Sequence, residues 1–298
     1  MRLLRHLFDF ERTETPGERI FYRLFEAMVL YWTLNFAWEW GFYILRIQDV
    51  VLPLGIAEHL DISFMFSGPW PLVNAAAMTA FMLLGFARVW RFSYLVALLL
   101  FHLQYVSRYC LGEISHGSNV IGMAVLGMAL GAVAFADRQA MHRFVVGFNY
   151  FFLGLGYTSA AVCKLIASGP LWVDGRHLWL WIGERTVDIY SMTTVLDYNW
   201  VQSLALEWYP IATLILTFGL LVEAGGFLMW FKPTRLVSMS LLIMMHFGIA
   251  ASMKIHFWPN TLVLIFLAFP WTRWIDHLLA RLDAAQRDKV DRMSIRFA

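Results

Sequence analysis

The chain has 298 residues, of which 60% are apolar and 15% are charged, whereas a soluble domain typically has about 45–50% apolar and about 25% charged residues. The mean hydropathy is +0.60, and 17% of the residues are aromatic. This composition excludes a disordered, fibrous or disulfide-stapled protein and predicts an all-α, polytopic membrane bundle. The net charge of +2 is too small to indicate a polyanionic partner, so we expect no nucleic acid to bind.

Apolar runs bounded by charged residues, proline and glycine predict about eight membrane spans. A crossing needs about 20 mostly apolar residues, so this length holds at most about nine. The runs at 70–87 and 257–271 are short, and each is either a full crossing or a tilted or re-entrant segment. The predicted spans are 24–45, 70–87, 92–111, 119–136, 144–167, 209–230, 236–253 and 257–271.

The basic residues predict the orientation, because cytoplasmic segments carry an excess of lysine and arginine. If both termini are inside, 17 of the 23 basic residues fall on the cytoplasmic side. The outer segments then hold Arg46, Arg176, Arg185 and Lys254, while Arg108 and Lys164 lie within spans. We therefore expect an N-in, C-in protein of the plasma (inner) membrane. The inner basic residues are Arg2, Arg5, Arg12, Arg19, Arg23, Arg88, Arg91, Arg138, Arg143, Lys232, Arg235, Arg273, Arg281, Arg287, Lys289, Arg292 and Arg296.

The chain is expected to form one membrane domain over 21–271 with a short polar tail at each end. Residues 1–20 form the first cytoplasmic tail, and the first apolar run lacks a small-residue cleavage site, so we expect an uncleaved anchor. The tail at 272–298 has the charge spacing of an amphipathic helix on the inner surface. Two large segments, 46–69 and 168–208, are expected on the outer side.

A small set of ionisable side chains falls at membrane depth, where each costs about 2.5–3.5 kcal/mol unless a partner or a wet cavity compensates. Glu39 and Arg108 are expected in the outer half, as a structural ion pair or as functional residues. For His102 and His246, near the middle, the simplest role is an interhelical hydrogen bond. Glu223 precedes Ala-Gly-Gly, so we expect it to cap a neighbouring backbone where helices approach closely.

Lys164 follows small residues on its helix, including Ala160 one turn earlier. These residues leave room for another helix or for a flat ligand. Burial disfavours the charged form of an amine, which makes a desolvated lysine a usable general base. The alternative is that the ammonium group extends to the nearby outer interface. The residues alone leave both roles open.

The sequence gives little support to a metal or redox centre. Because no run of residues has the spacing of a known metal site, we expect no metal. The absence of C-x-x-C argues against a dithiol redox centre. Cys110 and Cys163 fall near the outer ends of spans, where they form either two buried thiols or a disulfide in an oxidising compartment.

Three stretches resemble the HTTM family of membrane proteins. The stretch YTSAAVCKL at 157–165, followed by WVDG at 172–175, is similar to the family element Y-x-x-A-G-x-x-K-L…W-x-x-G. The stretch EISHGSNVIG at 113–122 resembles the histidine-containing segment of the family. Glu223 and His246 match an acidic residue and a histidine of the later helices. The resemblance extends over residues 20–270.

Vitamin K-dependent carboxylases belong to this family, so the resemblance implies an activity. In those enzymes a base on the lumenal side deprotonates a vitamin K hydroquinone, which reacts with oxygen to give a strong base. That species removes the γ-proton of a glutamate, which then captures carbon dioxide. The resemblance assigns the catalytic base to Lys164 and the functional histidine to His116, both on the outer side.

The implied cofactor is vitamin K hydroquinone or menaquinol, entering from the lipid between helices. Aromatic side chains such as Trp179 and Trp181 are expected to exclude water and to stack on a flat ring, or else to form an interfacial aromatic belt. The residues expected to bind the cofactor are Tyr157, Ala160, Trp172, Glu39, Arg108 and His246.

The sequence also departs from the family pattern. Ala161 replaces the usual glycine. The segment between Lys164 and Trp172 is three residues longer than in the family pattern, and it includes Gly169 and Pro170. The large lumenal region of the carboxylases has no counterpart here, so we expect a small molecule or a peptide or protein glutamate as substrate at the outer face. The alternatives are a non-catalytic binding, transport or immunity protein, and a protein that matures a partner docked on 168–208.

Overall fold

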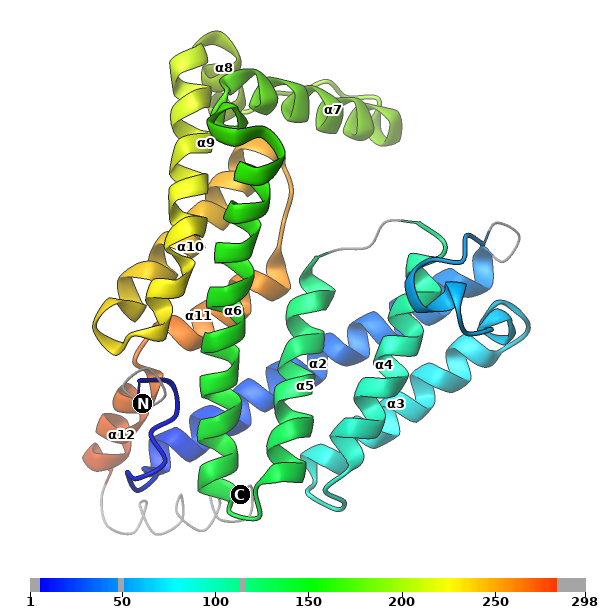
Figure 1. Ribbon diagram of the computed structural model, residues 1–298, viewed down its shortest axis with the longest axis vertical. Coiled ribbons are helices and arrows are strands. Elements are labelled where there is room, and N and C mark those ends of the chain that lie inside the picture. Colours follow the sequence, from blue (N-terminus) through cyan, green and yellow to red (C-terminus); the bar gives the residue numbers. More distant parts are fainter. Residues whose placement is uncertain (1–5, 48–50, 113–115, 283–298) are drawn as a thin grey trace. The chain divides into compact units, whose positions relative to one another are not determined.

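The computed structural model describes residues 6–47, 51–112 and 116–282. Within these ranges the chain is helical and contains no strand, which confirms the all-α prediction (Figure 1). The helices are α2 (Pro16–Arg46), η1 (Gly55–Glu58), η2 (Ser63–Phe66), α3 (Trp70–Phe86), α4 (Ser93–Tyr109), α5 (Gly117–Ala134), α6 (Arg138–Ser168), η3 (Gly169–Val173), α7 (Gly175–Thr193), α8 (Trp200–Glu207), α9 (Tyr209–Ala224), η4 (Gly225–Trp230), α10 (Lys232–Met253), α11 (Trp258–Ala268) and α12 (Trp271–Arg281).

The chain divides into two compact units, and the boundary falls within α6. Unit 1 consists of Met1–Leu7 and Tyr150–Phe269, and unit 2 consists of Phe8–Asn149 and Pro270–Ala298. Unit 1 therefore holds the second half of α6 together with α7 to α11. Unit 2 holds α2 to α5, the first half of α6 and α12.

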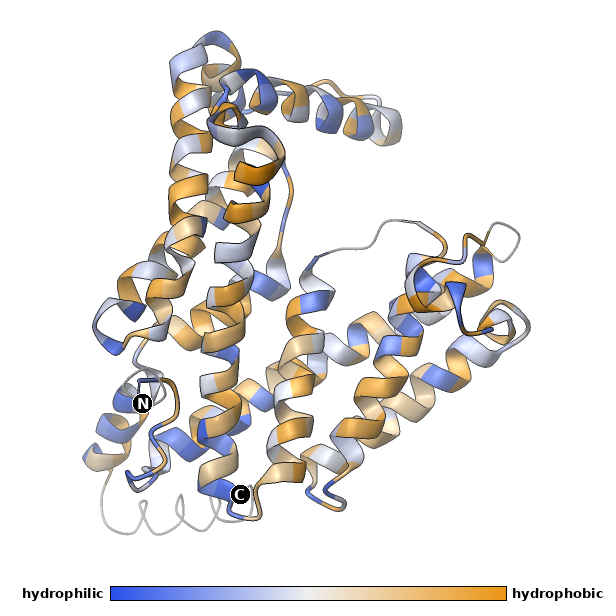
Figure 2. Ribbon diagram, viewed as in Figure 1, coloured by the Kyte–Doolittle hydropathy of each residue, from blue (hydrophilic) through white to orange (hydrophobic). Residues whose placement is uncertain are grey.

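Several helices confirm the expectation of a membrane protein. In the part of the chain that the structure describes, four helices are long and apolar enough to cross a membrane, and a fifth results if α11 and α12 form one broken span. Figure 2 shows apolar residues along most of α9 and α10. The predicted spans 24–45 and 92–111 fall on α2 and α4, which are not among the four helices that are long and apolar enough to cross a membrane. The four are Gly117–Ala134, Arg138–Val173, Tyr209–Trp230 and Lys232–Met253.

Helix α2 begins at Pro16, well before the predicted span at 24–45, because a capping box precedes its apolar run. The Thr15 hydroxyl accepts a hydrogen bond from the Glu18 amide at 3.2 Å, and the Glu18 carboxylate accepts one from the Thr15 amide at 3.0 Å. Proline at the first position has a φ angle that already suits a helix. These contacts satisfy the hydrogen-bonding capacity of backbone amides at the start of the helix. A search for apolar runs does not detect them, so it begins the helix too late.

The outer segment predicted at 168–208 is largely helical. Helix α7 packs on α8 and α9 through a buried apolar core, and Figure 1 shows it extending sideways from the start of α9. Gly175 allows this contact, because a Cβ atom there would lie 2.8 Å from the Tyr209 carbonyl oxygen. This packing holds the chain that follows Lys164 against the start of α9. The core residues are Leu178, Ile182, Ala205, Ala212 and Leu216.

Unit 2 contains a buried ionic network that the apolar pattern did not predict. The Glu26 carboxylate is fully buried and accepts hydrogen bonds from Arg88 at 2.6 and 3.0 Å, from Arg23 at 2.6 Å and from the Tyr94 hydroxyl. The buried carboxylate is compensated because two half-buried arginines share it. The network ties α2 to the turn between α3 and α4.

Helix α12 covers the start of the predicted tail at 272–298, and residues 283–298 lie outside the described residues. Its Asp276 carboxylate accepts a hydrogen bond from the Thr15 hydroxyl at 2.7 Å and one from the Gly17 amide at 2.8 Å. Gly17 permits this approach, since a Cβ atom there would lie 2.7 Å from Asp276 Cγ and would meet the Thr272 carbonyl oxygen. Glycine is therefore required at this contact.

Replacing Gly17 with alanine should separate α12 from α2. A methyl group forced into the contact with Asp276 costs about 1–3 kcal/mol, as overpacking typically does. We expect a lower thermal unfolding midpoint for Gly17→Ala in detergent. Gly219→Ala is the matched control, because nothing lies within 4 Å of a Cβ atom at Gly219. Equal midpoints for the two variants would contradict the close contact.

Glu14 connects the segment before α2 to the first turns of α6. Its carboxylate lies 2.6 Å from Nδ1 of His142 and accepts a hydrogen bond from Arg19 at 3.4 Å. Burial alone would raise the pKa of the Glu14 carboxyl, yet hydrogen bonds and charge from His142 and Arg19 hold this pKa below its ordinary value of 4.5. A carboxyl group whose pKa is lower in the folded than in the unfolded protein stabilises the fold at pH values above its pKa in the unfolded protein.

The stabilisation from Glu14 is therefore complete above about pH 4.5 and is lost as the pH falls through the lower pKa of the folded state. We expect the unfolding midpoint of the wild type to decrease in this acidic range. The Glu14→Gln variant should be less stable near neutral pH and should lose less on acidification. Parallel pH profiles for the two proteins would exclude this contribution.

Candidate functional site

The centre of the candidate site is an ion pair between Lys164 on α6 and Glu223 on α9. Nζ of Lys164 donates to Oε2 of Glu223, and the exposed fractions of the two side chains are 28% and 10%. The capping role expected for Glu223 is therefore replaced by a pairing of charges. This contact holds the ammonium group of Lys164 against α9. The alternative prediction was that this group extends to the outer interface.

An aromatic ring contacts the same amine. Nζ of Lys164 lies 4.6 Å from the centroid of the Trp172 ring, a distance at which a cation is attracted to the ring face. Trp172 reaches this place because α6 ends at Ser168 and Gly169 takes a positive φ of 59°, which reverses the chain into η3. The extra residues between Lys164 and Trp172 thus form the turn that brings the ring back to the amine.

The turn after Trp172 is fixed by polar contacts outside the apolar helices. The Trp172 carbonyl oxygen lies 3.0 Å from Nδ1 of His177. Asp174 caps α7, and its carboxylate accepts hydrogen bonds from Nε of Arg176 at 3.0 Å. Hydrogen bonds from Arg176 hold the pKa of the Asp174 carboxyl far below its usual range. Asp174 is therefore an ionised cap, and it positions the segment that carries Trp172.

A second polar group lies on the same face of α6. The Tyr157 hydroxyl lies 2.8 Å from Nε2 of His246 on α10, and Nδ1 of that histidine lies 3.3 Å from the Thr261 hydroxyl on α11. Tyr157 and Lys164 are seven residues apart, so they share one side of the helix at a separation of about 10 Å along its axis. His246 and Thr261 are both buried.

Close packing between α6 and η4 determines which residues face each other. A Cβ atom at Gly226 would lie 2.8 Å from Cβ of Tyr157, and the Phe227 amide donates to the Thr158 hydroxyl at 2.9 Å. The sequence Glu223-Ala-Gly-Gly thus supplies both the carboxylate and the small residue that lets its helix approach α6. Unit 1 brings together four predicted site residues: Lys164, Tyr157, Trp172 and His246. Ala160, one turn before Lys164 on the same helix, is half-buried.

The other predicted residues belong to unit 2, and their membership of the site stays a prediction. His116 is exposed at the N-cap of α5. Glu39 is exposed on α2. The Arg108 guanidinium on α4 lies 3.8 Å from the centroid of the Tyr43 ring and donates to the Gly112 carbonyl at 3.3 Å.

Two further expectations concern tryptophans and cysteines. Nε1 of Trp179 donates to the Ala205 carbonyl at 2.6 Å and its ring packs against the core of α7 and α8, so this side chain has a structural role. The Trp181 ring lies 5.7 Å from that of Trp172. Cys110 is buried and Cys163 is exposed, and both are free thiols.

The structure adds Thr261 and Asn260 to the candidate site. Both are buried on α11, and Thr261 completes the contact with His246, while Oδ1 of Asn260 has no hydrogen-bond partner within the described residues. The only sequence signal was a pair of polar residues after Pro259 at the start of an apolar run. That signal is indistinguishable from an ordinary helix start, because such positions favour polar residues.

The arrangement combines three chemical capabilities in unit 1. Lys164 with Glu223 can hold and transfer a proton, the Trp172 ring offers a flat aromatic surface, and Tyr157 with His246 offers hydroxyl and imidazole groups for hydrogen bonds. Comparison of the chain with protein-family models, with curated proteins and with solved structures gave no match. The resemblance to the HTTM family therefore rests on the residues quoted above.

Removing one member of the Lys164–Glu223 pair should destabilise the protein more than removing both. A single substitution leaves an unpaired charge in apolar surroundings, which typically costs about 3–5 kcal/mol when the pair is fully buried. Because Lys164 is 28% exposed, we expect the lower end of that range. Unfolding midpoints of Lys164→Met, Glu223→Leu and the double variant measure the coupling, and additive losses would show that the two groups do not interact.

Proposed function

We propose that this chain is a membrane enzyme of the HTTM type that binds a reduced quinone and uses Lys164 as a general base. One observation carries the proposal. The amine of Lys164 contacts both the carboxylate of Glu223 and the ring of Trp172, on helices apolar enough to cross a membrane. A purely structural ion pair has no need of the aromatic surface that accompanies this one.

The proposed proton path begins at a hydroxyl group of the ligand and ends on Nζ of Lys164. The amine must be neutral to accept that proton. Glu223 is the group in contact with this amine, so it is the group that can carry the proton of the pair while Lys164 acts as the base. Once protonated by the ligand, the ammonium group is stabilised by the ring of Trp172. Glu223 is thus a positioning residue that also stores a proton.

The residues present fit a flat, mostly apolar ligand with polar ends. Nothing lies within 4 Å of a Cβ atom at Gly156, and Ala160 follows one turn later, so a ring can approach α6 closely. Tyr157 and His246 would bind one polar end of a vitamin K hydroquinone or a menaquinol. When bound, such a group supplies through its reaction with oxygen the base strength needed to remove a carbon-bound proton, after which carbon dioxide adds to a glutamate-type or small substrate.

The proposal includes the orientation predicted from charge. Eight spans with both termini in the cytoplasm would place Lys164 and His116 on the outer or periplasmic side of the plasma (inner) membrane. The roles that the resemblance assigns to His116, Glu39 and Arg108 are part of the proposal, and substitution of each residue in turn would test them. A substrate peptide, protein or small molecule would then arrive from outside.

A non-catalytic binding, transport or immunity protein is the second candidate. The observation in its favour is a set of exposed apolar side chains on and after α7, including Val187, Met192 and Trp200 with exposed fractions of 67%, 74% and 77%. Exposed apolar residues of this kind often contact a partner or a membrane. On this alternative, Lys164 and Glu223 only hold α6 and α9 together.

The experiment combines lipid analysis with one substitution. Mass spectrometry of lipids that co-purify with the wild type should detect a menaquinone or related quinone. Lys164→Met should abolish quinol-dependent fixation of carbon dioxide, a loss of about 10²–10⁴-fold as expected for removal of a general base. Lys254→Met is the matched control, since that amine donates to the Asp197 carbonyl outside the site at 2.7 Å.

Three outcomes separate the candidates. Bound quinone with activity lost only in Lys164→Met supports the enzyme. Undiminished activity in a folded Lys164→Met protein refutes Lys164 as the base. If the wild type carries no quinone and binds no added menaquinone, the second candidate replaces the first.

A further inference from the structure

Helix α12 has three distinct sides. At 100° per residue, the apolar side chains of Trp271, Trp274, Ile275 and Leu278 cluster on one side, and Thr272 and Asp276 lie on the next. The remaining side is polar and basic. It carries Arg273, His277 and Arg281.

The side that carries Asp276 is already occupied. Its two carboxylate oxygens accept hydrogen bonds from the Thr15 hydroxyl and the Gly17 amide, both at the start of α2. The contact through Gly17 is too close for any side chain. Helix α12 is therefore fixed about its own axis, and the directions of its other two sides are set by the fold.

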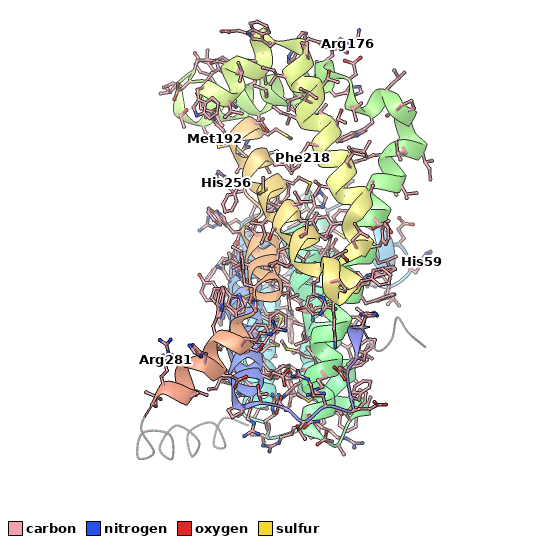
Figure 3. The ribbon with its side chains drawn as sticks, turned by 90° about the vertical axis from the view of Figure 1, so that its left-hand side faces the viewer. His59, Arg176, Met192, Phe218, His256 and Arg281 are labelled. Carbon is pink, nitrogen blue, oxygen red and sulfur yellow. The ribbon has the colours of Figure 1, made fainter. Side chains whose placement is uncertain are left out.

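Those two sides are exposed in different ways. Trp274 and Leu278 are exposed to 52% and 62%, and the rings of Trp271 and Trp274 meet edge to face at 5.0 Å. Arg273, His277 and Arg281 are also exposed, and Figure 3 shows Arg281 directed away from the neighbouring helices. An apolar aromatic strip thus runs beside a row of basic groups.

This pattern fits the surface of a bilayer better than its interior. Placing Arg273, Asp276 and Arg281 at the hydrocarbon centre would cost about 2.5–3.5 kcal/mol for each charge. An amphipathic helix instead lies in the interface, with its apolar side among the acyl chains and its basic side among the headgroups. The charge of Asp276 is engaged by α2, so the side of α12 facing the headgroups presents two arginines and no carboxylate.

We infer that α12 is an interfacial helix that binds anionic phospholipids, with Trp274 and Leu278 in the acyl region and Arg273 and Arg281 on the headgroup phosphates. Each basic side chain close to an anionic surface strengthens the attraction. Tryptophan suits the boundary because its ring is apolar while its N–H group binds polar partners. Because α12 lies outside the candidate site, this inference is independent of the proposed enzymatic function.

Spin labels in the full chain test the position of α12. In a Cys110→Ser/Cys163→Ser background, Leu278→Cys places a nitroxide on the apolar side, and His277→Cys places a matched label on the basic side. In vesicles of phosphatidylcholine and phosphatidylglycerol, the label at 278 should collide with oxygen more often than with a water-soluble nickel chelate. The label at 277 should show the reverse.

Lipid analysis tests the preference for anionic headgroups. We expect the ratio of phosphatidylglycerol to phosphatidylcholine retained by the purified protein to fall by about 5-fold for each arginine removed, in Arg273→Gln and Arg281→Gln. Arg185→Gln is the control, since Arg185 lies on α7 and pairs with Asp188 at 3.5 Å.

Other results would overturn the inference. A label at 278 that is reached by the nickel chelate as readily as the label at 277 would show that α12 does not enter the bilayer. A label at 278 shielded from both reagents would indicate that a protein covers this side. An unchanged lipid ratio in both arginine variants would exclude anionic headgroups as ligands.

Discussion

The pairing of Lys164 with Glu223 is the constraint on which the rest of the candidate site depends, because neither charge can remain alone in apolar surroundings. A lysine placed in a predicted span needs a compensating partner, and here the partner is the Glu223 carboxylate on α9. That requirement fixes α9 against α6, and Gly226 makes the approach possible. The pair therefore couples the helix packing of unit 1 directly to its chemistry.

The segment after α6 turns back over the same amine. The positive φ of Gly169 and the short η3 helix bring Trp172 over the amine, and Asp174 and Gly175 then lock α7 onto the start of α9. The two contacts of the Lys164 amine, Trp172 and Glu223, thus lie at opposite ends of the segment 172–223. The amine of Lys164, the Trp172 ring and the Tyr157–His246 pair are all held by residues of unit 1.

Much of this arrangement could be predicted from sequence, but for different reasons at different residues. The apolar runs at 209–230 and 236–253 predict their helices well, because length and hydropathy determine a spanning helix. Lys164 was also recognisable, since a basic residue in an apolar run is costly. For its partner Glu223 the sequence indicated only a structural role such as backbone capping, because one sequence does not report which helices are neighbours. Glu26 escaped notice because the arginines that neutralise it, Arg23 and Arg88, come from different helices and turns.

Thr261 and Asn260 illustrate the same limit at the site itself. A polar residue at the start of a helix has a local explanation, so only the tertiary contact with His246 reveals Thr261 as part of the site. Likewise, α2 begins earlier than its apolar pattern suggests, because the cap of Thr15 and Glu18 acts through hydrogen bonds. Hydropathy determines where helices can lie, whereas polar contacts determine their ends and partners.

We propose that the Lys164–Glu223 pair accepts a proton from a bound hydroquinone. The most direct test is the absorbance spectrum of a naphthohydroquinone bound anaerobically to the purified protein near neutral pH. For the wild type we expect the red-shifted spectrum of a ligand that has lost its hydroxyl proton, and for Lys164→Met we expect the spectrum of the neutral ligand. A neutral spectrum in both proteins, with equal binding, would contradict the claim.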